Sequence, residues 1–445
     1  MSNNRQAASA SPWRAPLLFA GLAVLFVLEG TVNNAMFSGS WNTALGILNM
    51  GLISAITALG VNMQWGYAGL FNVGVVGFLA LGAVAPVLVA LPPVAGAWDA
   101  GVPRLVLALL TGIATLAIAR IAWGRLRRFR GLVVAAILLA GFVAYRALFD
   151  PAVSAIEANN SASAGNIGGL GLPVLLSWPV GGLLAAGAAW AIGKVALGLR
   201  SDYLAIATLG IAEIVVAVLR NEDWLARGVK NIAGIPRPVP YEIQLQQNPE
   251  FVSAAADWGM SAATASGIWV KLGYSFLFVA VLLALILLAE LALKSPWGRM
   301  MRAIRDNEEA AGAMGKNVTA RHLQVFVLGS AVIGVAGAMM ITLDGLLAPT
   351  SFNPLRYTFL IWVMVIVGGS GNNWGAALGG VLIWFLWIKV EVWGPALIGL
   401  LVTPLPDGAL RDQLLGSAPH MRFIVMGLVL LAVLRFAPRG LVPEK

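Results

Sequence analysis

The chain of 445 residues has no cysteine, only two histidines and few charged residues. The absence of cysteine excludes disulfides and thiolate metal sites. His322 and His420 lie far apart in the sequence, which is a poor basis for a metal site or a catalytic triad. Asp, Glu, Lys and Arg make up 11% of the chain, whereas soluble globular proteins carry about a quarter. A water-soluble enzyme of this length is therefore excluded.

Hydrophobic residues make up 59% of the chain, and the mean hydropathy is +0.84. Lipid forces every backbone polar group to find a partner within the protein, and helices are the default solution. The sequence therefore predicts an all-α, polytopic transmembrane protein, with a single domain over residues 1–445 and about 10–12 spans. Glycines interrupt two runs, at 66–74 and 368–375, where broken half-helices are possible. The apolar runs lie at about 15–33, 42–62, 73–91, 104–123, 131–149, 174–193, 203–219, 270–293, 323–343, 357–370, 374–393 and 421–436.

The basic residues are distributed unevenly between the two sides of this predicted helix array. With the N-terminus inside and twelve alternating spans, 18 of the 29 Lys and Arg residues lie in the inside segments. Because Lys and Arg are retained on the cytoplasmic side, the N- and C-termini are both predicted to be cytoplasmic. The segment 295–318 is then a cytoplasmic loop, and 220–269 is an external loop. This distribution accounts for the net charge of +9, so nucleic acid is not expected as a partner.

The loop from Ser295 to Val318 has the pattern of a short amphipathic helix that ends at Gly315. Apolar residues recur at helical spacing, and charged residues lie between them. Two interpretations fit this pattern: a helix that anchors lipid at the membrane surface, or a docking surface for a soluble partner. The apolar positions are Met300, Met301, Ile304 and Ala311, and the charged ones are Arg299, Arg302, Arg305, Asp306, Glu308 and Glu309.

The stretch Glu309-Ala310-Ala311, followed by three residues and Gly315, matches the EAA-x-x-x-G loop of ABC importer permeases, the segment that fits a cleft on the ATPase. Together with the words at 48–74, 201–215, 295–315 and 367–380, it resembles the permease subunits of branched-chain amino acid importers. The chain looks most like the M-type subunit of the Liv system. The matching words occur in order over about residues 42–393.

The resemblance implies a permease of a bacterial inner membrane that translocates Leu, Ile and Val. It also implies four kinds of partner: two ABC ATPase subunits, a second homologous permease, an external amino-acid-binding protein and membrane lipid. No G-x-x-x-x-G-K-[ST] word is present, so ATP and Mg²⁺ are expected on the partner ATPases. This chain is not expected to be an enzyme, and it is assigned no cofactor, metal or catalytic residue. The residues expected to couple it to the ATPases are Arg302, Arg305, Glu308, Glu309, Ala310, Ala311 and Gly315.

The two glycine-interrupted segments share a short word, Gln-Trp-Gly at 64–66 and Asn-Trp-Gly at 373–375. Paired interruptions in a transporter point to the permeation pathway, where the N-terminus of a half-helix can receive a carboxylate. Close helix packing through Gly371, Gly375 and Gly379 is the other interpretation. Glu213 lies in mid-span, where it either faces the pathway or pairs with a cation on another helix. The candidate pathway residues are Gln64, Trp65, Gly66, Asn72, Thr208, Glu213, Gly371 and Asn373.

Three alternatives remain open. The first is a urea or short-amide permease of the same transporter class. The second is an ion-coupled secondary transporter that uses Glu213, Asp344 or Glu391. The third is a membrane-embedded enzyme, which is disfavoured because the sequence shows neither a nucleophile–base pair nor a metal cluster.

The sequence departs from the family pattern in two places. Residues 227–231 stand where a glycine-richer turn is expected, and 92–172 are longer than the family pattern.

Overall fold

The computed structural model describes residues 13–34, 36–126, 129–159, 165–403, 408–417 and 420–444. Each of the twelve apolar runs forms a helix, so the predicted class, an all-α polytopic membrane protein, is confirmed. The corresponding helices are α1 (Arg14–Thr31), α2 (Trp41–Ala68), α3 (Val75–Ala90), α4 (Ala95–Arg125), α5 (Arg130–Ala158), α6 (Ser177–Ala196), α7 (Ser201–Asn221), α11 (Ala262–Lys294), α14 (Val318–Asp344), α15 (Pro354–Gly368), α16 (Asn373–Val402) and α18 (Met421–Phe436).

Within the described ranges, nine of these helices are long and apolar enough to cross a membrane. A tenth span results if α18 is counted together with α17 (Ala409–Ser417). The apolar helices α3 and α15 are shorter, and each adjoins one of the two glycine interruptions. The short helices predicted beside the interruptions are therefore present.

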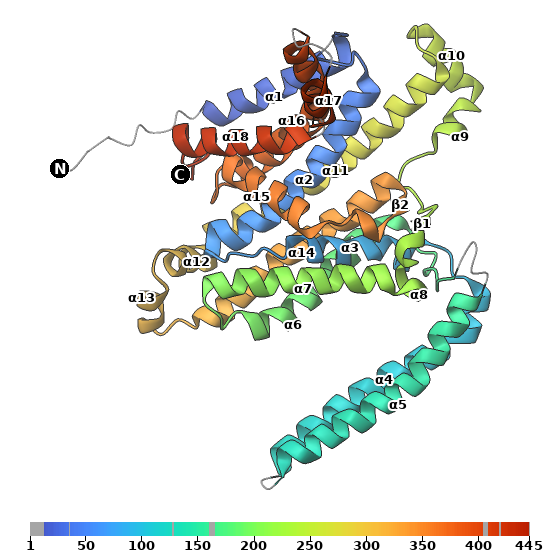
Figure 1. Ribbon diagram of the computed structural model, residues 1–445, viewed down its shortest axis with the longest axis vertical. Helices are drawn as coiled ribbons and strands as arrows, with labels where there is room; N and C mark the ends of the chain where they lie inside the picture. The colour runs from blue at the N-terminus through green and yellow to red at the C-terminus, as the bar shows by residue number, and fades with distance from the viewer. Residues whose placement is uncertain are drawn as a thin grey trace, which may run out of the picture.

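The helices run between two ends of the molecule (Figure 1). At the first end, which we call the α12 end, lie the start of α1, the end of α18, and the short helices α12 (Pro296–Asp306) and α13 (Glu308–Ala313). At the opposite end, the β end, two short strands pair antiparallel, with Ile232 opposite Leu347. The elements of the β end are α8 (Asp223–Ala226), η2 (Gly228–Lys230), β1 (Ile232–Ala233), α9 (Glu242–Gln246), α10 (Pro249–Asp257), β2 (Leu346–Leu347), η3 (Pro349–Ser351) and, before α6, η1 (Val174–Leu176).

The connection between α7 and α11 lies at the β end, opposite α12 and α13. The predicted loop 220–269 was too long at both ends, because α7 extends to Asn221 and α11 already begins at Ala262. The chain between them is not a plain loop, since it forms the short helices α8, α9 and α10 and strand β1.

Helices α2 and α14 form the centre of the bundle, and most of their residues are buried. The two helices approach closely at Gly60 and Gly329. A Cβ atom on Gly60 would lie 2.7 Å from the carbonyl oxygen of Gly329, and one on Gly329 would lie 2.6 Å from that of Gly60. Small residues allow backbones to come into van der Waals contact, which drives helix association in lipid. The contact fixes the helix that carries the first glycine interruption at the centre of the fold.

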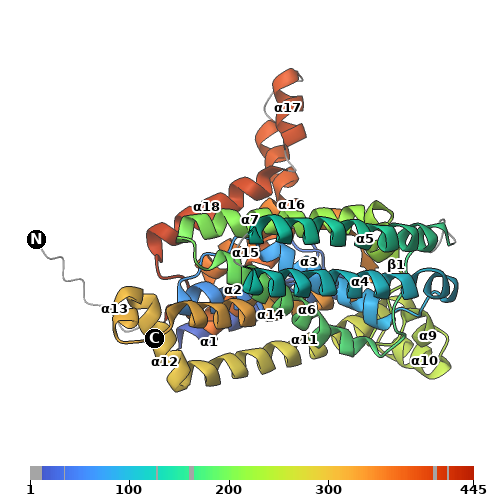
Figure 2. The same cartoon turned by 90° about the horizontal axis from the view of Figure 1, so that it is seen from below.

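Helices α4 and α5 form a hairpin that leaves the bundle near the β end and runs back towards the α12 end (Figures 1 and 2). The two helices pack on each other, and α5 buries only Ala152 and Ile156. The hairpin touches the bundle at its base, where Trp98 Nε1 donates to the carbonyl oxygen of Ile167 at 2.7 Å and Phe149 meets Trp224 edge to face. The hairpin occupies most of the region 92–172, and its second helix lies within described residues 130–158.

Candidate functional site

Both predicted glycine interruptions break a helix, and the two breaks lie against each other. The first lies between α2 and α3, and the second between α15 and α16. Asn62 Oδ1 accepts a hydrogen bond from the backbone N–H of Gly371 at 2.8 Å. A Cβ atom on Gly66 would lie 2.5 Å from that same nitrogen. Gly371 has a φ of +81°, a conformation that favours glycine. Two segments far apart in the sequence thus form one site.

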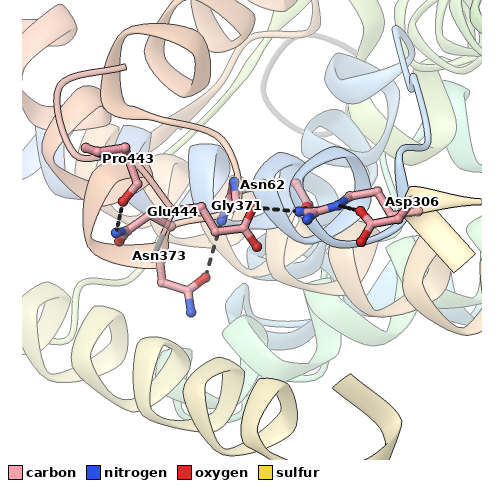
Figure 3. A network of polar contacts seen from close by, with 9 residues as sticks. Asn62, Asp306, Gly371, Asn373, Pro443 and Glu444 are labelled. Carbon is pink, nitrogen blue, oxygen red and sulfur yellow. Dashed lines mark hydrogen bonds and ion pairs between the residues drawn. The ribbon is translucent and has the colours of Figure 1, made fainter. Parts of the chain in front are cut away.

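A buried amide network connects the two breaks (Figure 3). Asn373 is 1% exposed, and its oxygen accepts from Asn62 Nδ2 at 3.3 Å and from the Tyr67 hydroxyl. Its nitrogen donates to Glu290 Oε1 at 2.9 Å. Because the oxygen and the nitrogen of this amide are both occupied, Asn373 ties α2, α11 and α16 together.

Gln64 extends the network towards α14. Its nitrogen donates to Ser330 Oγ and to the carbonyl oxygen of Phe326, both at 3.0 Å. Its oxygen accepts from Asn72 Nδ2 at 2.8 Å. Asn72 Oδ1 in turn accepts from the backbone N–H of Gly74 at 2.9 Å, within the first break. The side-chain amides of Gln64 and Asn72 therefore hydrogen-bond both to backbone groups and to each other.

Thr208 and Trp65 lie at the edge of this region. Thr208 Oγ1 accepts from the backbone N–H of Val73 at 3.1 Å, which attaches α7 to the first break. The Trp65 ring packs edge to face on Trp362, with 4.9 Å between the ring centroids. Seven of the eight candidate pathway residues thus lie at or beside the two breaks. In the described conformation they pack and hydrogen-bond, and their part in substrate passage stays a prediction.

Glu213 is the exception, because it is exposed on the outer side of α7 in mid-span. Among the residues that the structure describes, its carboxylate takes part in no hydrogen bond or ion pair. In contrast, the carboxylates of Glu29 in α1 and Glu290 in α11 both have partners. Glu29 is fully buried and binds Lys389 Nζ at 2.8 Å, and Glu290 accepts from Asn373. One interpretation of the sequence was that Glu213 pairs with a cation on another helix. No such ion pair forms among the described residues.

The loop 295–318 was predicted as one amphipathic helix, and this was wrong: it forms two helices. Asn307 is extended, with a φ of −158°, and its side chain accepts from the backbone N–H of Ala310 at 2.9 Å. Asn307 thereby ends α12 and caps α13. The predicted apolar face is otherwise correct, since Met301, Ile304 and Ala311 are buried.

Six of the seven candidate coupling residues divide into two groups, and the seventh, Ala311, is buried. The members that are exposed at the α12 end are Glu308, Glu309, Ala310 and Gly315. Beside them, a cleft of about 710 Å³ separates the loop from the turn between α6 and α7. The two arginines turn towards the protein instead. Arg302 donates to the carbonyl oxygen of Leu293 at 3.3 Å, and Arg305 donates to the carbonyl oxygen of Gly66.

Arg305 therefore joins the candidate coupling loop, residues 295–318, to the first helix break. Its guanidinium also binds Glu444 at 2.9 Å and Asp306 at 3.3 Å. Burial disfavours the charged form, but these two carboxylates more than offset it and raise the pKa of Arg305 above its usual value. The guanidinium is thus a fixed positive charge between the loop and the bundle.

The sequence did not identify Asn62, Tyr67, Glu290 and Ser330 of the network, nor Glu444 beside it. A signal existed for Asn62 and Tyr67, which lie in the same family-like word as Gln64, one helical turn or less from Gly66. Glu290 carried only the signal of a carboxylate inside an apolar run, and Glu444 carried none, because the partners of both are distant in the sequence. Within the described part of the chain, no three His, Asp or Glu side chains come together as a metal site.

Long apolar helices around a buried polar network, with an exposed amphipathic loop at one end, define a polytopic helical membrane protein. The chain belongs to the branched-chain amino acid transport system permease component family, whose sequence model matches residues 129–434. Three of the four family-like words lie within that match, and the word at 48–74 precedes it.

The chain is 31% identical over 236 residues to the high-affinity branched-chain amino acid transport system permease protein LivM of Escherichia coli and to that of Salmonella typhimurium. Each alignment covers 52% of this chain and 53% of the relative, so the chain spans about half the length of these two proteins. It is 26% identical over 298 residues to the probable branched-chain amino acid transport permease protein LivM of Methanocaldococcus jannaschii, covering 66% of this chain and 74% of that protein. No solved structure matches the chain.

The stability of the purified chain should depend on Glu29 and not on Glu213. Replacing Glu29 with Gln leaves the buried Lys389 ammonium without its carboxylate, and breaking a buried pair in this way costs about 3–5 kcal/mol. Glu213→Gln removes no contact within the described residues. Thermal unfolding in detergent, followed by tryptophan fluorescence, should show a lower midpoint for Glu29→Gln alone. An equal drop for Glu213→Gln would contradict this description of α7.

Proposed function

We propose that the chain is the permease subunit of an ABC importer that moves branched-chain amino acids across a bacterial inner membrane. The observation that carries the proposal is the family match over residues 129–434, a range that contains the coupling loop and the second helix break. The names of the E. coli and S. typhimurium relatives support the same substrates, leucine, isoleucine and valine. The importer assignment makes this chain a transport subunit, with hydrolysis of ATP on other chains.

Two ABC ATPases, with ATP and Mg²⁺, are the proposed partners of the α12 end. The exposed acidic and small side chains of α13 support docking, because a helix that enters a cleft needs low bulk at its contact face. Arg305 supports transmission, since it links the loop to the carbonyl oxygen of Gly66 at the first break. A push on α12 and α13 would thus reach the centre of the bundle through one side chain.

A second, homologous permease is the proposed partner of the α7 face that carries Glu213. An ionised carboxylate in mid-span is costly against lipid unless a polar group or water covers it. The exposure of Glu213, without a partner in the described chain, supports a protein or aqueous surface at this face. Substrate would then cross between the two permeases. On this proposal, Glu213→Gln weakens retention of the second permease while the stability of the isolated chain is unchanged.

The external binding protein is proposed to deliver substrate at the β end, where the short helices α8, α9 and α10 lie. This proposal requires the α12 end, with the start of α1 and the end of α18, to face the cytoplasm. The excess of Lys and Arg in the segments of that end supports this orientation.

Uptake of radiolabelled leucine tests the substrate and the energy source together. Proteoliposomes that hold the complete transporter should accumulate leucine only with ATP and loaded binding protein, and excess valine or isoleucine should compete. Uptake should persist when an ionophore collapses the proton gradient at constant ATP. Loss of uptake with the ionophore would favour an ion-coupled transporter that uses Glu213, Asp344 or Glu391. Uptake of urea in place of leucine would favour the short-amide permease.

Single cysteines test the orientation, because the wild-type chain has none and gives no background. Ser253, in α10 at the β end, is exposed, and Met314, after α13, is 80% exposed. A membrane-impermeant thiol reagent should label Ser253→Cys in intact cells and Met314→Cys only after lysis. Labelling of Met314→Cys from outside would reverse the proposed orientation.

Gly315 and Gly312 form a matched pair for testing the coupling loop. Neither has an atom within 4 Å of an added Cβ, but only Gly315 has a left-handed φ, of +78°. An L-residue there costs about 1–2 kcal/mol, which displaces the end of α13. Gly315→Ala should reduce binding-protein-stimulated ATP hydrolysis or ATPase retention, whereas Gly312→Ala should retain both. Equal, full activity of the two variants would indicate a loop that faces lipid.

A further inference from the structure

The segment 437–444, which follows α18, lies across the break between α15 and α16. The backbone N–H groups of Leu441 and Val442 donate to the carbonyl oxygens of Val367 and Gly368, at 2.8 and 2.9 Å. Asn372 Nδ2 donates to the carbonyl oxygen of Pro443 at 3.1 Å. The carbonyl groups of Val367 and Gly368 lie at the end of α15, where no following helical turn supplies N–H donors. The segment therefore supplies partners that the broken helix lacks.

Glu444 connects this segment to the coupling loop (Figure 3). Its Oε2 lies 2.9 Å from a terminal nitrogen of Arg305, which also donates to the carbonyl oxygen of Gly66. A Cβ atom on Gly371 would lie 2.7 Å from the same Oε2. Helix α12, the end of α2, the second break and the segment 437–444 thus meet at one ion pair.

We propose that Glu444 is a positioning residue for energy coupling. It holds Arg305 against the Gly66 carbonyl and the second break, so that a displacement of α12 moves both helix breaks together. This inference rests on the proposed function, because it assumes that an ATPase displaces α12. A cavity of about 560 Å³ beside the pair, lined by Arg302, Ser370 and Arg439 among others, gives α12 room to move.

The ion pair contributes little to stability, which separates a positioning role from a structural one. The side chains of Arg305 and Glu444 are 24% and 34% exposed, and pairs that solvent reaches stabilise proteins only weakly. Asp306 provides the matched control. It also pairs with Arg305, but it lies on the same helix, is 68% exposed, and links α12 to no other segment among the described residues.

The test compares Glu444→Gln, Glu444→Asp and Asp306→Asn in the reconstituted transporter. Glu444→Gln should retain the ATPases and hydrolyse ATP at the basal rate, while leucine transported per ATP falls by about fivefold or more, the lower range of measured coupling between sites. Glu444→Asp should recover part of this loss, because it keeps the charge, and Asp306→Asn should couple as the wild type does. An unchanged ratio in Glu444→Gln, or an equal loss in Asp306→Asn, would overturn the proposal.

A second measurement does not depend on transport. Hydrogen exchange of the purified permease should show faster exchange in Glu444→Gln at the amides of Leu441 and Val442 and in residues 366–372, and no change there in Asp306→Asn. Unaltered exchange in Glu444→Gln would overturn the link even if transport fails for other reasons. A different outcome would contradict the proposed function and not the link. In that outcome, exchange is altered in Glu444→Gln, but the wild-type complex neither transports leucine nor responds to binding protein.

Discussion

A helix that breaks inside a membrane leaves backbone N–H and C=O groups that lipid cannot satisfy. This constraint organises the α12 end of the molecule. Each break is closed by carboxamides: Asn72 accepts from Gly74, Asn62 accepts from Gly371, and Asn372 accepts from Trp374 and Gly375. Because one of the amides that close the second break, Asn62, belongs to α2 beside the first break, a direct hydrogen bond links the two breaks.

The coupling loop depends on the same constraint, because it is attached to a backbone group of the first break. Within the described residues of α12 and α13, Arg305 binds Gly66 on α2 and Glu444 beyond α18, whereas Arg302 binds only the neighbouring end of α11. If an ATPase docks on the exposed face of α13 as proposed, a displacement of that helix would reach the buried amides through Arg305. Two conformations of the protein could also be distinguished by this network, because each hydrogen bond is either kept or exchanged for another.

The sequence predicted those elements that depend on local residue pattern alone. The apolar runs located the twelve long or apolar helices, and the glycine interruptions located both breaks, because lipid makes each of these signals strong. The bounds of the coupling helices were wrong at Asn307, where a side-chain cap replaces a helical turn. The partners of Asn373 and Arg305 could not be predicted, because Glu290 and Glu444 reach them only through the tertiary fold. The position of Glu213 likewise depends on which side of α7 the bundle covers.

Exposure has different meanings on the hairpin and on α7. The exposed side chains of α4 and α5, such as Leu109, Ile113, Leu116 and Phe142, are apolar along the middle of the helices, and lipid satisfies them without any further partner. The hairpin can therefore extend from the bundle with contacts only at its base. Helix α7 exposes Ile206 and Ile214 in the same way, but it places the Glu213 carboxylate between them. Lipid cannot satisfy that group, which is why the second permease is proposed at this face and not at the larger surface of the hairpin.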